Sequence, residues 1–347
     1  MPHVQTVLGP VDPAVLGRVL THEHLLALTP GPWLSGGPGD PGAPERARRF
    51  AAQQVDLAVA ALGALADHGF GTVVDLSPYG DAGRDAHGAN TVLLQEISRR
   101  TGLHVVSGTA GYRAEFSPAW VRAAGVAELT RRFVADATQG IGGTGVRAGI
   151  LGEQPTGEGR ITAHEARGLR AAARAHHATG LTLSTHTTHG TMALEQLALL
   201  AEEGVEPQRV VIGHLDLHPD PDHLRRVLDT GATIAFDSIG KEFWDVRTPP
   251  PTGPVPEGEY TKRAVHRSDV ARADRLARLV ELGHAEQLVL SQDLTGGQLH
   301  LNPRTHGRWG YCYLPAVFTG LLTERGVSER QLDTMLRDNP ARLLTVG

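Results

Sequence analysis

Eight short runs of apolar and β-branched residues recur along the 347-residue chain, each bounded by turn residues. Between them lie amphipathic stretches rich in Ala, Leu and Arg, which end near glycines that can cap a helix. A doubly wound open sheet would give a similar alternation, but the strand count favours an α/β fold of the closed (β/α)8 TIM-barrel type. The expected strands are residues 18–24, 72–76, 104–108, 146–151, 181–186, 209–214, 232–237 and 288–293.

The connections between these strands predict the rest of the architecture. No linker or low-complexity tract divides the chain, so we expect residues 1–347 to form a single barrel domain. Long loops follow strand 7 (238–267) and strand 8 (294–313), on the face where barrel active sites lie. The expected helices are 46–68, 91–101, 120–138, 163–179, 191–203, 221–230 and 269–283, with a last helix at 328–337 that ends before Asp338-Asn339-Pro340.

The amino-acid composition of the chain excludes several classes of function. The chain has 33 Lys and Arg against 38 Asp and Glu, with no long run of one sign, so we expect neither a nucleic-acid partner nor an anionic membrane surface. No signal-peptide pattern and no apolar run of about 18 residues is visible, which leads us to expect a cytoplasmic protein. The single cysteine, Cys312, excludes a multi-thiolate metal site, so any metal must be held by histidines and carboxylates.

Six potential metal ligands follow or end the expected strands. Chance alone gives roughly one His-x-His pair among 18 histidines, so the His22-Glu23-His24 motif is weak evidence by itself. Alternation along a strand makes the two imidazoles point the same way and Glu23 the other. A lone histidine at a strand end is usually structural. Histidines and carboxylates at the same end of five expected strands, however, favour a metal centre for zinc, manganese, cobalt or iron. The candidates are His22, His24, Glu153, His186, His214 and Asp293, with Glu153 as the candidate bridge between two ions.

The order of the motifs resembles a known family. TVLGPV, LTHEHL, RAGILGE, LSTHT, VVIGHLD, FDSIGK, LSQD and DNPARLL, spread from about Val4 to Leu344, are similar to the phosphotriesterase-related branch of the amidohydrolase superfamily, and to its phosphotriesterase homology proteins in particular. This resemblance implies a (β/α)8 barrel with two divalent ions, commonly zinc. It also implies that His22, His24 and Asp293 hold the buried ion, that His186 and His214 hold the exposed one, and that Glu153 bridges them.

Two positions depart from the specialised members of this family. The phosphotriesterases and lactonases resemble one another in having a carboxylated lysine as the bridge, whereas the only lysines here, Lys241 and Lys262, come after the sixth strand. At FDSIGK, Ser238 stands where the organophosphate hydrolases have a histidine and the lactonases an arginine. Both specialised activities are therefore in doubt.

The expected chemistry is hydrolysis. Two ions lower the pKa of a bridging water toward about 7, and the resulting hydroxide attacks a carbonyl or phosphoryl group. We expect Asp293 to act as the general base, with Glu153 as the bridging catalytic residue. Asp216 either relays the proton onward or, as we prefer, orients a ligand imidazole.

Substrate recognition is less constrained. We expect the rim cations Lys241, Arg304 and Arg308 to bind an acidic group of the substrate, although charged loop residues are often only solvated. Tyr112, which aligns with a rim tyrosine of the lactonases, is expected to contact the leaving group or to serve in packing.

The sequence thus predicts a metal-dependent hydrolase of a carboxylic ester, a lactone or an N-acyl amide. The alternatives are a phosphotriesterase and a catalytically silent metal-binding barrel. The expected cofactors are two divalent ions, zinc first, and the expected partner is a small-molecule substrate. The family resemblance also implies a homodimer.

Overall fold

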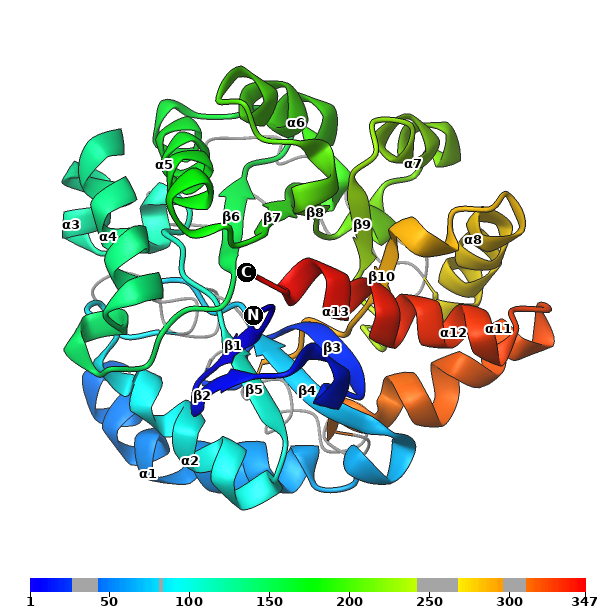
Figure 1. Ribbon diagram of the computed structural model, residues 1–347, viewed down its shortest axis with the longest axis horizontal. Coiled ribbons are helices and arrows are strands. Elements are labelled where there is room, and N and C mark those ends of the chain that lie inside the picture. Colours follow the sequence, from blue (N-terminus) through cyan, green and yellow to red (C-terminus); the bar gives the residue numbers. More distant parts are fainter. Residues whose placement is uncertain (27–42, 81–83, 242–267, 296–309) are drawn as a thin grey trace.

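A ring of parallel strands lies at the centre of the computed structural model, and helices surround it (Figure 1). The structure describes residues 1–26, 43–80, 84–241, 268–295 and 310–347. Within them, the ring consists of β3 (Arg18–Glu23), β4 (Phe70–Asp75), β5 (His104–Ser107), β6 (Leu151–Thr156), β7 (Leu183–Thr187), β8 (Val210–Ile212), β9 (Thr233–Phe236) and β10 (Leu288–Leu290).

The strands form two parallel sheets, ordered β3-β4-β5 and β6-β7-β8-β9-β10. One seam between the sheets is the pairing of Gly108 with Ile150. At the other, beyond the end of β10, the Asp293 amide donates to the carbonyl of His22 at 2.9 Å, and the His24 amide donates to the carbonyl of Leu294 at 3.0 Å. These two seams close the ring, which confirms the predicted (β/α)8 barrel.

The helices pack their apolar faces against the outside of the ring. Every residue of β6, β7, β8, β9 and β10 is buried, as expected for parallel strands that are covered on both faces. The helices are α1 (Ala43–Leu62), α2 (Val92–Thr101), α3 (Ala119–Ala123), α4 (Val126–Thr138), α5 (Ala163–Thr179), α6 (Ala193–Glu202), α7 (Pro221–Leu228), α8 (Asp269–Glu281), α11 (Thr319–Glu324), α12 (Glu329–Asp333) and α13 (Asn339–Leu344).

The two ends of the chain meet at one end of the barrel. A short antiparallel hairpin, β1 (Val4–Thr6) and β2 (Gly9–Val11), lies there beside α13 (Figure 1). His3 and Val346 exchange two backbone hydrogen bonds of 2.9 Å each. The opposite end, where the carboxyl ends of the ring strands lie, carries the candidate site.

Three sequence predictions need correction. The fourth strand is Leu151–Thr156 rather than 146–151, because residues 149 and 150 bond to the end of β5 and the strand that pairs with β7 starts only at Leu151. The helix expected at 120–138 is broken into α3 and α4 at Ala124 and Gly125, and the extended Gly125 is the N-cap of α4. The last helical run continues through Pro340, because a π-helical turn at Thr334–Asp338 joins α12 to α13 and accommodates the proline at the start of α13.

The predicted long loops lie largely outside the described residues, at 242–267 and 296–309. Among the helices that the structure describes, none combines the length and the apolar character that a membrane crossing requires.

Candidate metal centre

The six predicted ligands come together at the carboxyl end of the ring. His22 lies in β3, Glu153 in β6 and His186 in β7, while His214 and Asp293 follow β8 and β10. Glu153 therefore lies inside its strand rather than just past it. His214 and Asp293 have φ values of 60° and 49°, a left-handed conformation that is uncommon outside glycine and tends to occur at functional sites.

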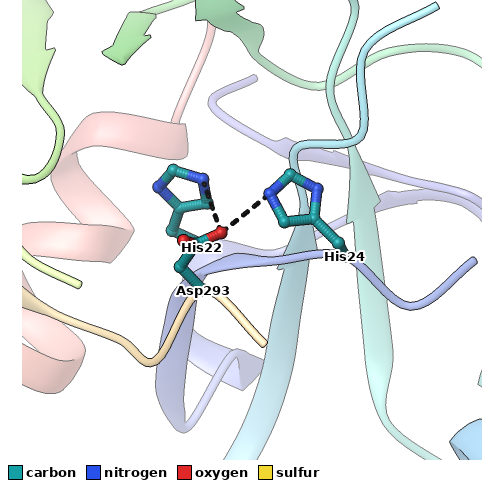
Figure 2. A group of neighbouring side chains, drawn as sticks. All are labelled: His22, His24 and Asp293. Atoms are coloured by element: carbon teal, nitrogen blue, oxygen red, sulfur yellow. Dashed lines mark ion pairs between the residues drawn. The ribbon is translucent and has the colours of Figure 1, made fainter. Parts of the chain in front are cut away.

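His22, His24 and Asp293 form the first group of donors. Oδ1 of Asp293 lies 2.9 Å from Nε2 of His24 and 3.7 Å from Nε2 of His22. Figure 2 shows both imidazoles turned toward this carboxylate. Their donor atoms lie within 4.8 Å of one another, a spacing that one ion could occupy.

Glu153, His186 and His214 form the second group. Nδ1 of His186 lies 3.1 Å from Oε2 of Glu153 and 2.9 Å from Nε2 of His214. All three side chains are at most 6 % exposed, so their polar atoms face one another rather than solvent. These donor atoms also lie within 4.8 Å of one another.

The carboxylate of Glu153 lies between the two groups. Its Oε1 is 3.4 Å from Nε2 of His24, and its Oε2 is 3.1 Å from Nδ1 of His186. Oε2 also lies 3.5 Å from Nε2 of His22, so the carboxylate reaches donors of both groups, as a bridging ligand must.

Asp237, which sequence reasoning missed, orients two of the imidazoles. Its Oδ2 accepts from Nδ1 of His22 at 2.8 Å, and its Oδ1 accepts from Nδ1 of His214 at 2.9 Å and from the His214 amide at 2.9 Å. Occupying Nδ1 in this way fixes the tautomer and leaves the Nε2 lone pair for a metal. Its signal in the sequence was its place as the last residue of the expected seventh strand.

Burial and charge together perturb the ionisation of these groups. Burial lowers the pKa of His214, but Asp237 outweighs that effect and raises the pKa to about 9. Burial raises the pKa of Glu153, but His22 and His186 outweigh it and hold the pKa well below its ordinary value. Glu153, Asp237 and Asp293 thus concentrate negative charge at this end of the barrel, and buried carboxylates require nearby cations.

The donor atoms fit a metal. Nε2 of His22 is buried and has no hydrogen-bond partner among the described residues, although it lies 3.5 Å from Oε2 of Glu153. A buried nitrogen without a hydrogen bond destabilises the fold, and binding a metal ion would remove this penalty. Imidazole nitrogens combined with carboxylate oxygens are the donors that zinc and similar divalent ions take in proteins.

Two predicted substrate residues lie at the rim of this centre. The Lys241 ammonium, 21 % exposed, donates to Oδ2 of Asp293. The Tyr112 hydroxyl lies 3.4 Å from Nδ1 of His186. The other two predicted substrate residues, Arg304 and Arg308, lie outside the described residues.

Asp216 has a different role from either one predicted for it. Its Oδ2 accepts from Nε of Arg272 at 2.7 Å, and Nη1 of Arg272 also donates to Asp269 at 2.6 Å. All three side chains are at most 1 % exposed, so this is a buried structural ion pair, and Asp237 holds the imidazoles instead.

Comparison with known proteins gives consistent matches. The sequence profile of the phosphotriesterase family matches residues 2–344. A phosphotriesterase homology protein of Escherichia coli (strain K12) is 37% identical over 255 residues, which are 74% of this chain and 79% of that protein. The phosphotriesterase homology protein of Mycobacterium tuberculosis (strain CDC 1551 / Oshkosh) is 32% identical and covers 99% of this chain and 98% of its own length.

Two further matches extend the comparison. N-acetyltaurine hydrolase of Salmo salar is 27% identical over 99% of this chain and 97% of its own length. The crystal structure of the Escherichia coli phosphotriesterase homology protein, complexed with phosphate in its active site, superposes with a TM-score of 0.75. It covers 96% of this chain and 100% of its own at 31% identity.

Proposed function

The chain belongs to the phosphotriesterase family, and on that premise we propose that it is a binuclear metal-dependent hydrolase of N-acyl amides that carry an acidic group. Hydrolysis of ester or amide bonds follows from the family and from its N-acetyltaurine hydrolase members. The number of ions, their identity and the preferred bond are our proposals. The observation that carries them is the position of Glu153 between the two donor groups, with Oε1 near His24 and Oε2 near both His22 and His186.

We assign the ligands by the two groups. His22, His24 and Asp293 would hold one ion, His186 and His214 the other, and Glu153 would bridge them. Zinc is the ion that we propose first, because four imidazoles and two carboxylates suit its preference for nitrogen and oxygen donors. Two such ions would supply an acidified water for attack at neutral pH and would polarise the scissile carbonyl group.

The two oxygens of Asp293 face different surroundings. Oδ1 faces His22 and His24, whereas Oδ2 points to the rim, where it accepts from Lys241. Asp293 can therefore bind a metal ion through Oδ1 and take a proton from the attacking water on Oδ2. In that position it would pass the proton to the leaving nitrogen as the amide bond breaks.

Lys241 supports an acidic substrate. In the structure its charge is balanced by Asp293, and ligation of Asp293 by a cation would place a second positive charge beside that carboxylate and so weaken its pairing with Lys241. An acidic group of the substrate, such as a carboxylate or a sulfonate, would then supply the missing charge. The N-acetyltaurine hydrolases, which match almost the whole chain, favour an acylated amine over a phosphotriester.

The test combines metal analysis with a substrate panel. The purified protein is loaded with zinc or manganese, bound metal is counted by elemental analysis, and products are identified by mass spectrometry. The panel contains N-acetyltaurine, N-acyl amino acids, lactones, aryl esters and a phosphotriester. We expect two ions per chain and cleavage of the acidic N-acyl amides, and we expect Asp293→Asn to abolish turnover. One ion per chain, or cleavage of lactones or phosphotriesters in preference to amides, would contradict the proposal.

A further inference from the structure

Glu23 occupies the centre of the His-x-His motif, but it has no place in the metal centre. Its neighbours His22 and His24 point toward the candidate ions, and strand alternation turns Glu23 to the other side of β3. There its side chain is fully buried. A carboxyl group in such a position is costly unless its oxygens accept hydrogen bonds.

The hydrogen bonds to Glu23 come from the segment that carries Asp293. Oε1 accepts from the Ser291 hydroxyl at 2.8 Å and from the Gln292 amide at 2.9 Å. Oε2 accepts from the Leu294 amide at 2.8 Å. The carboxyl group of Glu23 therefore holds residues on both sides of Asp293.

This segment has an unfavourable conformation that needs support. Asp293 has a φ of 49°, a backbone angle that residues other than glycine rarely adopt. Its amide donates to His22 at 2.9 Å, and the Ser291 hydroxyl accepts from the His22 amide at 2.9 Å, so the segment is fixed to the metal-binding strand. The Glu23 bonds lie on the same seam and oppose relaxation of Asp293 toward ordinary backbone angles.

We propose that Glu23 is a positioning residue, whose carboxyl group holds the 291–294 segment so that Asp293 meets the imidazoles of His22 and His24. The role of Asp293 as ligand and base rests on the function proposed above, whereas the positioning itself does not require a bound ion. Gly310 and Leu314 lie beside this segment, since Nε2 of Gln292 donates to the Gly310 carbonyl at 3.5 Å and its Oε1 accepts from the Leu314 amide at 2.8 Å. None of these neighbours replaces the three bonds to Glu23.

The test is Glu23→Gln, which keeps the shape of the side chain. Both oxygens of the ionised carboxylate accept, but the amide nitrogen of glutamine only donates, so it meets an N–H or O–H donor whichever way it is turned. In the metal-free protein we expect amide hydrogen exchange in peptides covering 290–295 to become roughly tenfold faster or more. In the loaded protein we expect zinc affinity to fall about 10- to 100-fold and the visible spectrum of the cobalt form to change.

Glu165→Gln is the matched control. Glu165 is also a buried glutamate, and its Oε2 accepts from the Thr162 amide at 2.7 Å in the capping box of α5. It lies beside β6, and it makes none of the bonds that join Glu23 to the 291–294 segment. The Glu165→Gln variant should leave amide exchange in 290–295, the zinc affinity and the cobalt spectrum unchanged. A lowered melting temperature for Glu23→Gln with all three readouts at the wild-type value would overturn the proposal. If the wild-type protein bound no metal, the proposed function would fail, but exchange in the metal-free protein would still decide the role of Glu23.

Discussion

Asp237 lies behind His22, with its Oδ2 2.8 Å from Nδ1 of the imidazole. Its other oxygen lies 2.9 Å from Nδ1 of His214, a residue of the other donor group. One carboxylate therefore orients ligands on both sides of the centre.

Asp237→Asn should weaken metal binding about 10- to 100-fold, because the amide cannot accept from both imidazoles and the His214 amide at once. Competition with a chromophoric chelator measures this affinity. Asp216→Asn is the control, since Asp216 is equally buried but contacts Arg272 rather than an imidazole. Equal losses of affinity in the two variants would show that general destabilisation is responsible.

Arg272→Met should lower the free energy of unfolding by about 3–5 kcal/mol. The variant leaves two buried carboxylates, Asp216 and Asp269, without their shared cation. Urea unfolding of the metal-free protein measures the change. Arg278→Met is the control, because it removes the cation of an exposed ion pair with Glu281. If it changed the free energy of unfolding by more than about 0.5 kcal/mol, the expected difference between buried and exposed ion pairs would be wrong.

His218 should make stability depend on pH below neutrality. Burial and the stacked ring of His223, 3.9 Å away between centroids, lower the pKa of His218 to about 4. Between about pH 6.5, the ordinary value, and pH 4, the unfolded chain binds a proton that the folded protein does not. This contribution to stability is therefore present above pH 6.5 and is lost as the pH falls.

His218→Gln should then flatten the fall of the melting temperature between pH 6.5 and pH 4, measured by calorimetry on the metal-free protein. His68→Gln changes an exposed histidine and should reproduce the wild-type profile. If the melting temperature of His218→Gln fell more steeply than that of the wild type, the pKa of His218 would not be lowered in the folded protein.

Lys241→Met should raise KM for acidic N-acyl amides about tenfold or more, because a charge-assisted hydrogen bond to the substrate is lost. Steady-state kinetics on an acidic substrate and on its neutral amide analogue separate this effect from a general loss of activity. An unchanged KM for the acidic substrate would refute the role of Lys241 in binding.

The sequence was sufficient to predict the barrel and to nominate the residues that converge at its carboxyl end. Strand 4 was misplaced because LGEQPT contains glycine and proline, which disfavour strands, and pairing with β7 overrides that preference. The break at Ala124 and Gly125 is the kind of boundary that a glycine signals, but continuous helical periodicity on both sides hides it.

The role of Asp237 illustrates what the sequence could not supply. An aspartate at a strand end can ligate a metal, accept from a ligand or pair with an arginine, and only spatial neighbours distinguish these roles. For this reason the orienting role expected of Asp216 belongs to Asp237, for which the sequence indicated no role. Asp216 comes two residues after a ligand in sequence, whereas Asp237 reaches His22 across the ring from a position 215 residues away.

The seam between β3 and the end of β10 also bears on how the protein matures. The three-stranded sheet carries His22 and His24, and the five-stranded sheet together with the turns that follow its strands carries the other candidate ligands. Neither sheet alone holds all six residues, and the group of His22, His24 and Asp293 is divided between the two sheets. At this seam Ser291 and His22 meet across 269 residues of chain. Contacts of such long range carry a large loop-closure entropy and slow folding. Binding of an ion by His22, His24 and Asp293 would therefore report that the ring has closed. A chain arrested with its two sheets apart would lack that ion and the stabilisation that ligand binding gives to a native state.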